Sequence, residues 1–251
     1  MTTARRILVT GAASGIGRAV CEHLALGGAA VAALDREAAA LHEVVANLQA
    51  QGATAVEAVA DVADFEQVEQ AVNAAAAELG GLDAAVNVAG IGGYTGDVTA
   101  TSLPAWSATI AVNLTGIFHV CRAVIPLLRA AGGGAIVNVS SQYGLVGCAG
   151  APAYCASKAG VIGFTQALAI DHAAEGIRVN CVCPGPIDTP LLAASDAQAE
   201  SGRYERERTR GRLLVDGPGS PTDVAEAIDY MLGATFMTGS VLSLDGGWTA
   251  G

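Results

Sequence analysis

Short apolar runs rich in valine, isoleucine, leucine and alanine alternate along the chain with longer alanine-rich stretches that carry polar residues at intervals. The short runs predict strands, because strands buried on both faces read as nearly continuous apolar segments. They cover residues 7–10, 29–34, 54–59, 84–88, 135–140, 178–183 and 241–244. The pattern therefore predicts a sheet of about seven strands.

The longer stretches predict helices between these strands, over about residues 15–26, 37–51, 65–79, 104–130 and 153–175. Alternation of strand and helix is typical of an α/β fold, in which helices cover both faces of a parallel sheet. No linker, repeat or low-complexity tract interrupts it, and 251 residues are too few for two large domains. Residues 1–251 are therefore predicted to form a single domain with a doubly wound parallel sheet.

One stretch departs from this pattern. Residues 193–220 are polar, and arginines and glutamates crowd the segment 203–212. A segment of this kind late in an α/β sheet predicts a lid over a site, at about residues 190–215. The alternative is a solvated helix laced with charge pairs.

Composition narrows the classes of function. Apolar residues make up 52% of the chain and charged residues 15%, a balance typical of a well-buried enzyme-like domain. The net charge of −11 and the lack of a basic stripe argue against nucleic acid as a partner. The six cysteines form no CxxC pair and have no histidine at metal-ligand spacing, so no metal site is expected and a reducing compartment is favoured. No signal segment and no uninterrupted apolar run of membrane-spanning length is found, so we expect a soluble, cytoplasmic protein without membrane partners.

A glycine-rich segment, TGAASGIG at residues 10–17, lies between the first predicted strand and the first predicted helix. Glycines let the backbone turn tightly and let a pyrophosphate approach it closely, and the helix N-terminus presents free N–H groups to the anion. A glycine cluster alone is weak evidence, but this position at the start of a βαβ unit makes it strong. The residues predicted to bind the pyrophosphate of a dinucleotide are Gly11, Ser14, Gly15, Ile16 and Gly17.

Asp35 follows the second predicted strand and bears on the choice of cofactor. A carboxylate there can accept hydrogen bonds from both adenosine ribose hydroxyls and repels a 2′-phosphate, which favours NAD over NADP. Arg36 is the complication, because a guanidinium beside the ribose could pair with that phosphate. Asp35 could also cap the following helix, a role compatible with ribose binding.

Tyr154 and Lys158 lie four residues apart near the start of an apolar predicted helix, on one helix face. A nearby ammonium favours the phenolate, so Tyr154 is predicted to have a lowered pKa and to exchange a proton with an alcohol or carbonyl. Lys158 is the only lysine, and the other 12 basic residues are arginine. This usage indicates a site that needs a compact ammonium, against the alternative of a chance surface lysine.

Further motifs follow in a characteristic order. They are Asp61-Val62, NVAG at 87–90, Asn113, Ser140-Ser141, PGPIDT at 184–189 and DGG at 245–247. With the glycine loop and the Tyr154-x-x-x-Lys158 pair, they make the chain resemble the short-chain dehydrogenases/reductases over nearly its whole length. One departure is Val88, where the family often has a second asparagine.

The resemblance implies a Rossmann-type fold and a role for each matched position. Ser141 would hydrogen-bond the substrate oxygen, with Ser140 pointing to the other side of its strand, and Asn113 would relay protons from Lys158 through water. An alternative for Asn113 is a buried polar residue that bends its helix. The residues expected to contact the cofactor beyond the glycine loop are Asp35, Arg36, Asp61, Val62, Asn87, Ala89, Gly90, Tyr154, Lys158, Ile187 and Thr189.

Together these features predict an NAD-dependent oxidoreductase that interconverts a secondary alcohol and its ketone, with Asn113, Ser141, Tyr154 and Lys158 as the catalytic set. Two alternatives stay open. One is an NADP-dependent carbonyl (3-oxoacyl-type) reductase, which Arg36 permits and Asp35 opposes. The other is a non-catalytic dinucleotide-sensing protein, which the intact catalytic set opposes. A hydrolase is a poor fit, since no nucleophile–histidine–acid set is found.

The predicted substrate pocket comprises residues 91–97, 142–151 and 190–212, with Tyr143 as a wall. Its apolar character favours a small or medium-sized secondary alcohol, cyclic ones included, while the arginines at 203–212 leave a carboxylate or carrier-bound thioester open. The helix at 153–175 is apolar on almost every side and predicts burial against another copy of the chain. With the resemblance, it predicts a homo-oligomer, either a dimer or a tetramer.

Overall fold

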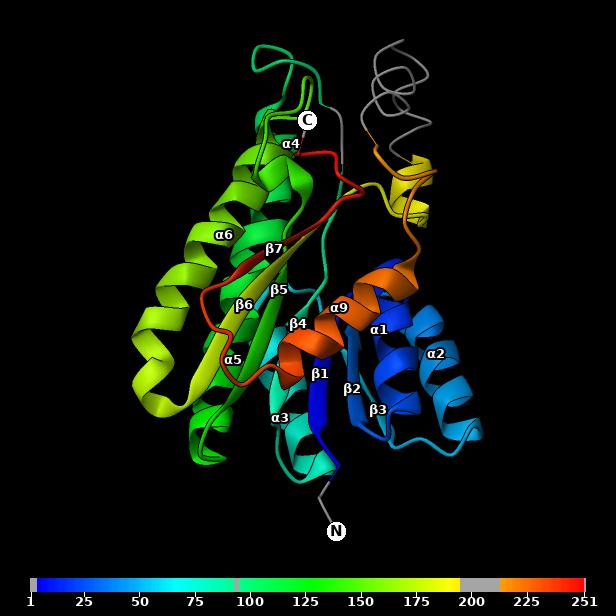
Figure 1. Cartoon of the computed structure of the whole chain (residues 1–251). Coiled ribbons are helices and arrows are strands. Elements are labelled where there is room, and N and C mark those ends of the chain that lie inside the picture. Colours follow the sequence, from blue (N-terminus) through cyan, green and yellow to red (C-terminus); the bar gives the residue numbers. More distant parts are fainter. Residues whose placement is uncertain (1–3, 93–94, 195–212, 251) are drawn as a thin grey trace.

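The computed structural model describes residues 4–92, 95–194 and 213–250. They contain one seven-stranded sheet in the order β3-β2-β1-β4-β5-β6-β7, with every neighbouring pair parallel (Figure 1). The strands are β1 (Arg6–Thr10), β2 (Ala30–Asp35), β3 (Ala55–Val59), β4 (Ala84–Asn87), β5 (Gly134–Val139), β6 (Ile177–Pro184) and β7 (Val241–Leu244). The predicted Rossmann-type, doubly wound α/β fold is confirmed.

Helices cover both faces of this sheet, because each parallel connection must cross over it. One face carries α1 (Gly15–Leu26), α2 (Ala38–Ala50) and α9 (Pro221–Gly233), whose apolar residues share a core with Val9, Val31 and Val137. The other face carries α3 (Phe65–Leu79), α5 (Gly116–Ala130) and α6 (Pro152–His172), with α4 (Leu103–Ile110) against α6. The two layers flank the sheet on opposite sides in Figure 1.

Most predicted elements lie within one or two residues of their observed bounds, and two differences stand out. The stretch 104–130 is a continuous helical segment, but a π-helical turn, η1 (Ala111–Thr115), separates α4 from α5. Helix α9 was not predicted, although Ser220 and Asp223 form a capping box at its start. Short 3₁₀ turns, η2 (Gln142–Gly144) and η3 (Ala173–Glu175), flank α6.

The segment Leu103–Ala130 is long and apolar enough to cross a membrane, by length and composition alone. This corrects the expectation that no run of such length is found. Its apolar residues Val120, Val124 and Leu128 are buried in the hydrophobic core between α5 and the sheet. The segment is therefore explained as a core helix.

The order of the strands places a crevice at their carboxyl ends. From β1 the chain adds strands outward through β2 and β3, and it then returns to place β4 on the other side of β1. At such a switch point, the connections after neighbouring strands leave toward opposite faces of the sheet, and ligands bind between them.

Candidate active site

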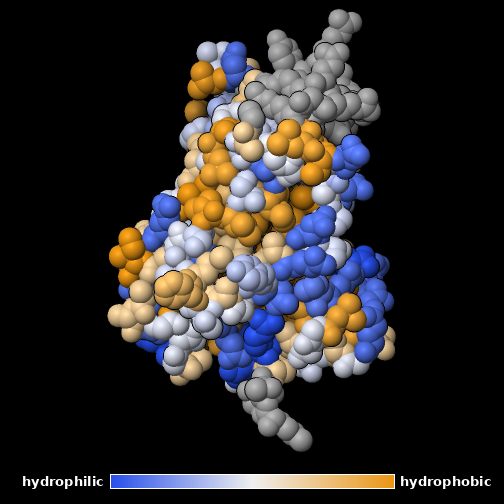
Figure 2. All heavy atoms as spheres, in the orientation of Figure 1, coloured by the Kyte–Doolittle hydropathy of each residue, from blue (hydrophilic) through white to orange (hydrophobic). Residues whose placement is uncertain are grey.

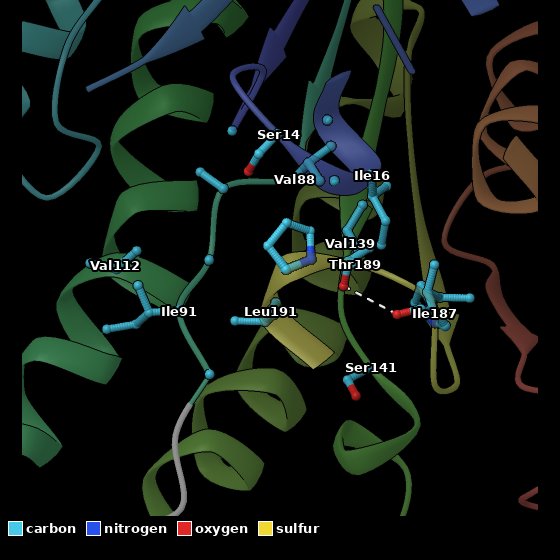
Figure 3. Close-up of a pocket in the computed structure, with 18 of the residues that line it drawn as sticks. Ser14, Ile16, Val88, Ile91, Val112, Val139, Ser141, Ile187, Thr189 and Leu191 are labelled. Atoms are coloured by element: carbon cyan, nitrogen blue, oxygen red, sulfur yellow. Dashed lines mark hydrogen bonds between the residues drawn. The ribbon is translucent and has the colours of Figure 1, made fainter. Parts of the chain in front are cut away.

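A cavity of about 380 Å³ lies at the carboxyl ends of β1, β2, β4, β5 and β6. Figure 3 shows Ser14 and Ser141 at opposite ends of the view, with Ile91 and Val112 on one side and Ile187 on the other. On the face shown in Figure 2, hydrophobic side chains gather in the upper middle part of the molecule. The pocket is thus elongated, with the glycine loop at one end and the predicted catalytic residues at the other.

Close backbone packing shapes the glycine-loop end. Gly11 has a φ of +67°, and a Cβ there would lie 2.9 Å from the backbone of Ala89. A Cβ on Gly17 would overlap the carbonyl oxygen of Gly11. Since α1 begins at Gly15 and Ser14 makes no side-chain cap, the first N–H groups of the helix stay available to the pocket. This cradle fits the pyrophosphate of a dinucleotide.

Asp35 and its neighbours form an acidic corner beside the loop. The carboxylate of Asp35 accepts hydrogen bonds from the N–H of Ala13 at 3.0 Å and from that of Glu37 at 3.1 Å. The Arg36 guanidinium lies 3.2 Å from the Glu37 carboxylate and 3.7 Å from that of Asp61. Arg36 is thus engaged by two acids within the pocket lining.

Ser141, Tyr154 and Lys158 meet at the far end, where β5 ends and α6 begins. The Lys158 ammonium donates a hydrogen bond to the carbonyl of Val139 at 3.0 Å and lies 5.7 Å from the centre of the Tyr154 ring. Ser140 points away from this group and donates to the backbone carbonyl of Lys158 at 2.7 Å, as the alternation of side chains along a strand predicts. Lys158 is only 4% exposed, so it is no chance surface lysine.

Burial dominates the electrostatics of this end. It raises the pKa of Tyr154 to about 12, against the opposing effect of the hydrogen bond with Ser141. It also lowers the pKa of Lys158 to about 8, because desolvation disfavours the ammonium. The direction is therefore opposite to the predicted lowering of the Tyr154 pKa, because desolvation outweighs the hydrogen bond with Ser141.

Asn113 lies behind the pocket wall and not in it. Its Oδ1 accepts from the N–H of Ile91 at 2.8 Å, and its Nδ2 donates to the carbonyl of Ile91 at 2.9 Å and to Ser157 at 3.2 Å. A Cβ on Gly90 would lie 3.3 Å from Asn113 Oδ1 and 3.4 Å from Lys158 Nζ, so the amide and the ammonium flank this glycine. Asn113 sits in the π-helical turn, which fits the bent-helix alternative as well.

Asn87 is not brought to the pocket, unlike Ala89 and Gly90. It is buried in the sheet, where its Nδ2 donates to Asn138 at 2.8 Å, and Asn138 in turn donates to Thr165 at 2.9 Å. Alternation along β4 explains this, because the side chain faces the α5 and α6 layer. The loop after β4 is fixed by Thr10, a residue of the TGAASGIG motif that was not among the predicted site residues, whose hydroxyl accepts from the N–H groups of Val88 and Ala89.

The segment after β6 closes the remaining side of the pocket. The Thr189 hydroxyl donates to the carbonyl of Ile187 at 3.1 Å, the bond drawn in Figure 3, and accepts from the N–H of Leu192. A Cβ on Gly15 would touch the Thr189 methyl group at 3.4 Å, so this segment packs on the glycine loop. Most of the predicted lid, with the arginines at 203–212, and residues 93–94 of the predicted pocket lie outside the described residues.

All other predicted site residues line the cavity. They are Gly11, Ser14, Gly15, Ile16, Gly17, Asp35, Arg36, Asp61, Val62, Ala89, Gly90, Ser141, Tyr154, Lys158, Ile187 and Thr189. The structure adds Glu37, Val139 and Pro184–Pro186 to this wall, and Gln142 and Tyr143 fall within the predicted 142–151 wall. The apolar additions follow from their positions at strand ends, a signal that could have been used. Among the described residues, no group of three histidine, cysteine or acidic side chains could hold a metal ion.

Comparisons with known proteins agree with this geometry. A family model described as short chain dehydrogenase matches residues 5–200. The chain is 41% identical over 248 residues to a cis-4-hydroxycyclohexanecarboxylate dehydrogenase of Sinomonas cyclohexanicum, covering 98% of this chain and 97% of that protein. It is 38% identical over 245 residues to a cyclohexanol dehydrogenase of Acinetobacter sp. (strain SE19), covering 97% and 94%. The crystal structure of levodione reductase superposes with a TM-score of 0.93 at 30% identity, covering 98% of each chain.

Proposed function

Since the chain belongs to the short-chain dehydrogenase/reductase family and is an oxidoreductase of secondary alcohols and ketones, we propose that it uses NAD and that Tyr154 exchanges the substrate proton. One observation carries the proposal. Ser141, Tyr154 and the buried Lys158 meet at one end of a cavity whose other end is a glycine cradle fit for a pyrophosphate. A dinucleotide whose pyrophosphate lies on this cradle would direct its nicotinamide toward the catalytic end.

The protein's part in the reaction is to hold the substrate oxygen and move one proton. Ser141 and Tyr154 hydrogen-bond this oxygen from the end of β5 and the start of α6. With a pKa raised to about 12, Tyr154 keeps its proton at neutral pH and can give it to a carbonyl oxygen. Alcohol oxidation needs the phenolate, which the nearby Lys158 ammonium stabilises. A bound nicotinamide supplies or accepts the hydride.

Lys158 and Asn113 assist this proton transfer without being assigned a direct contact with the substrate. Lys158 is held by the carbonyl of Val139, so its ammonium stays within reach of the Tyr154 ring. Asn113 holds both backbone polar groups of Ile91, which keeps this part of the pocket wall in place. We retain Asn113 in the proton path as part of the proposal, because it flanks Gly90 together with Lys158.

The acidic corner supports NAD over NADP. Asp35 already accepts two backbone N–H groups, and Glu37 and Asp61 lie close by, so a 2′-phosphate would meet three carboxylates. Arg36 is the one described cation in this corner, and its guanidinium is shared between Glu37 and Asp61. The NADP-dependent alternative would require these pairs to break.

The wall of the catalytic end supports a small or medium-sized, ring-containing secondary alcohol. Ile91, Val112 and Leu191 line it with apolar surface, on which a cyclohexane ring could pack. Two of the relatives are named for cyclohexane-ring substrates. The alternative of a carrier-bound 3-oxoacyl substrate depends on residues 203–212.

We also place the protein in the cytoplasm as a homo-oligomer, a dimer or tetramer. All six cysteines are free, and four of them are buried, which fits a reducing compartment. Apolar side chains remain exposed on neighbouring helices, among them Leu103 at 82%, Phe118 at 43% and Ile170 at 79%. Burial of these residues by a second copy of the chain would explain why apolar side chains occupy exposed positions.

The deciding experiment follows nicotinamide absorbance when the protein is mixed with NAD or NADP and a panel of secondary alcohols at mildly alkaline pH. We expect NAD to be reduced with cyclohexanol-like alcohols and NADP to react much more slowly. Binding of both dinucleotides is measured in parallel by calorimetry. If no alcohol of the panel changed the nicotinamide absorbance with either cofactor, and neither dinucleotide bound detectably, the proposal would be overturned.

A further inference from the structure

Gln142 lies directly after Ser141, at the start of the 3₁₀ turn η2. Its side chain is 3% exposed and belongs to the lining of the cavity. The amide oxygen, Oε1, is fully buried and has no hydrogen-bond partner among the described residues. Figure 3 places the neighbouring Ser141 at the catalytic end of the pocket.

A buried acceptor without a partner is unusual, because the loss of its hydrogen bonds to water is uncompensated. The polar groups around Gln142 do have partners. Ser140 donates to the carbonyl of Lys158 at 2.7 Å, Ser141 bonds Tyr154 and caps η2, and Lys158 donates to Val139 at 3.0 Å. Gln142 Oε1 is therefore the buried side-chain acceptor at this end that has no partner among the described residues.

The other unsatisfied asparagine or glutamine amide oxygen in the described chain has a different setting. Asn87 Oδ1 is also orphaned, but its Nδ2 is committed to Asn138 and the residue lies inside the sheet, away from the cavity. Asn87 is explained as part of a structural chain of polar side chains. The Gln142 side chain makes no hydrogen bond to another described residue, so its amide oxygen and nitrogen are left to pair with a ligand as acceptor and donor.

We propose that Gln142 is a specificity residue that hydrogen-bonds a second, uncharged oxygen of the substrate, close to the reacting carbon. The inference deepens the proposed function and rests on it. The second group is uncharged because an amide pairs equally with a hydroxyl or a carbonyl. A carboxylate would need a cation, and the described cations of the lining are Lys158, held at Val139, and Arg36 in the acidic corner. The favoured substrates are thus diols and hydroxyketones rather than simple alcohols.

The test compares kcat/KM for cyclohexanol with that for 1,2- and 1,3-cyclohexanediols in the wild type and in Gln142→Met. Methionine keeps the length and volume of glutamine but removes both hydrogen-bonding atoms. We expect the wild type to prefer a diol, and Gln142→Met to lower kcat/KM for that diol roughly tenfold while cyclohexanol changes by less than about twofold. The loss should fall mainly on KM, since the second oxygen does not react.

Thermal unfolding separates this role from a structural one. Replacement of an orphaned buried acceptor by an apolar isostere leaves stability unchanged or raises it, whereas loss of a structural amide lowers it. Gln142→Asn, which retains the amide but withdraws it by one carbon, provides a second folded variant and should also lose preference for the diol. Equal losses on cyclohexanol and diol with a lowered unfolding temperature, or no diol preference in the wild type, would overturn the inference. Inactivity on every alcohol with both cofactors would instead refute the proposed function, and the inference with it.

Discussion

The end of the pocket around residues 11–17 is shaped by backbone, whereas the end around Ser141, Tyr154 and Lys158 is shaped by buried side chains. At the first end, Gly11 and Gly17 are required because a Cβ would collide with the backbone of Ala89 or with the loop itself. At the second, Lys158 is 4% exposed and its ammonium lies 5.7 Å from the centre of the Tyr154 ring. The first end works through shape and fixed dipoles, and the second through titratable groups held out of water.

This difference decides how each end responds to substitution. A change at the backbone-built end adds bulk where atoms already touch, so the cost appears in stability and in cofactor binding together. A change at the catalytic end removes a chemical group from a site that can still fold. The two ends should therefore be separable by measuring turnover, binding and stability on the same variants.

The largest effect is expected from Tyr154→Phe. Loss of the hydroxyl removes the proton donor and acceptor, and turnover should fall by a factor of about 10³ or more while dinucleotide binding stays nearly intact. Steady-state kinetics and calorimetry with NAD measure the two quantities. Tyr143→Phe alters the other phenol of the lining, which has no lysine four residues on, and should keep most of the turnover. Comparable losses in both variants would remove Tyr154 from its acid–base role.

Lys158→Arg tests whether this end needs a compact ammonium rather than a positive charge. The guanidinium is larger and planar and cannot occupy the enclosed position beside Val139, so kcat should fall by about 10². Lys158→Met, which removes the charge at similar length, should be at least as impaired. Near-normal turnover of the arginine variant would contradict the role given to the only lysine.

Gly17→Ala probes the backbone-built end. The added Cβ would overlap the Gly11 carbonyl, and we expect a loss of about 2 kcal/mol in the free energy of unfolding with weakened NAD binding. Gly233→Ala is the matched control, because Gly233 is the last residue of α9 and a methyl group there would meet no atom of another described segment within 4 Å. That variant should be neutral or more stable by about 0.5 kcal/mol. Chemical denaturation measures the free energy of unfolding, and calorimetry measures NAD binding. Equal stability of both variants would refute the steric argument.

The pH dependence sharpens the account of the catalytic end. With the pKa of Tyr154 at about 12, its phenolate fraction rises about tenfold per pH unit, so kcat/KM for alcohol oxidation should rise with pH. The rise should flatten above pH 8, where Lys158, with its pKa lowered to about 8, loses the charge that stabilises the phenolate. Carbonyl reduction uses the protonated phenol and should stay flat from about pH 6 to about pH 8. An oxidation rate independent of pH in that range would contradict these assignments.

The fold was predictable because its signals are local. Each strand is a short apolar run, and α3, for example, begins at Phe65 just after Asp64, whose carboxylate caps the helix. The π-helical turn was not predictable, since Asn113 bonds to the backbone of Ile91, 22 residues earlier in the chain, and no nearby residue indicates that contact. Helix α9 could have been found from Ser220 and Asp223 and the spacing of Val224, Ile228 and Met231, but the polar segment before it obscured the alternation.

The two ends of the site differ in the same way. The glycine loop and Asp35 could be assigned from their place after β1 and β2, because a strand–turn–helix sequence fixes the geometry. The direction of the Tyr154 pKa shift could not, since it depends on how many distant residues cover the hydroxyl. The orientation of Asn87 and the unsatisfied amide of Gln142 likewise depend on packing between segments far apart in the sequence.

Asp35→Ala gives the smallest expected effect and tests whether charge adds to backbone shape at the first end. Removal of the carboxylate takes away the ribose acceptor and one of three acids that repel a 2′-phosphate, so the NAD/NADP ratio of kcat/KM should fall about tenfold. Asp35 also accepts from the N–H groups of Ala13 and Glu37, and its loss could loosen the loop. Asp35→Asn retains an acceptor oxygen without the charge. If the asparagine variant shifts the ratio as alanine does while keeping wild-type stability, charge selects the cofactor. An unchanged NAD/NADP ratio in both variants would show that Asp35 does not select the cofactor.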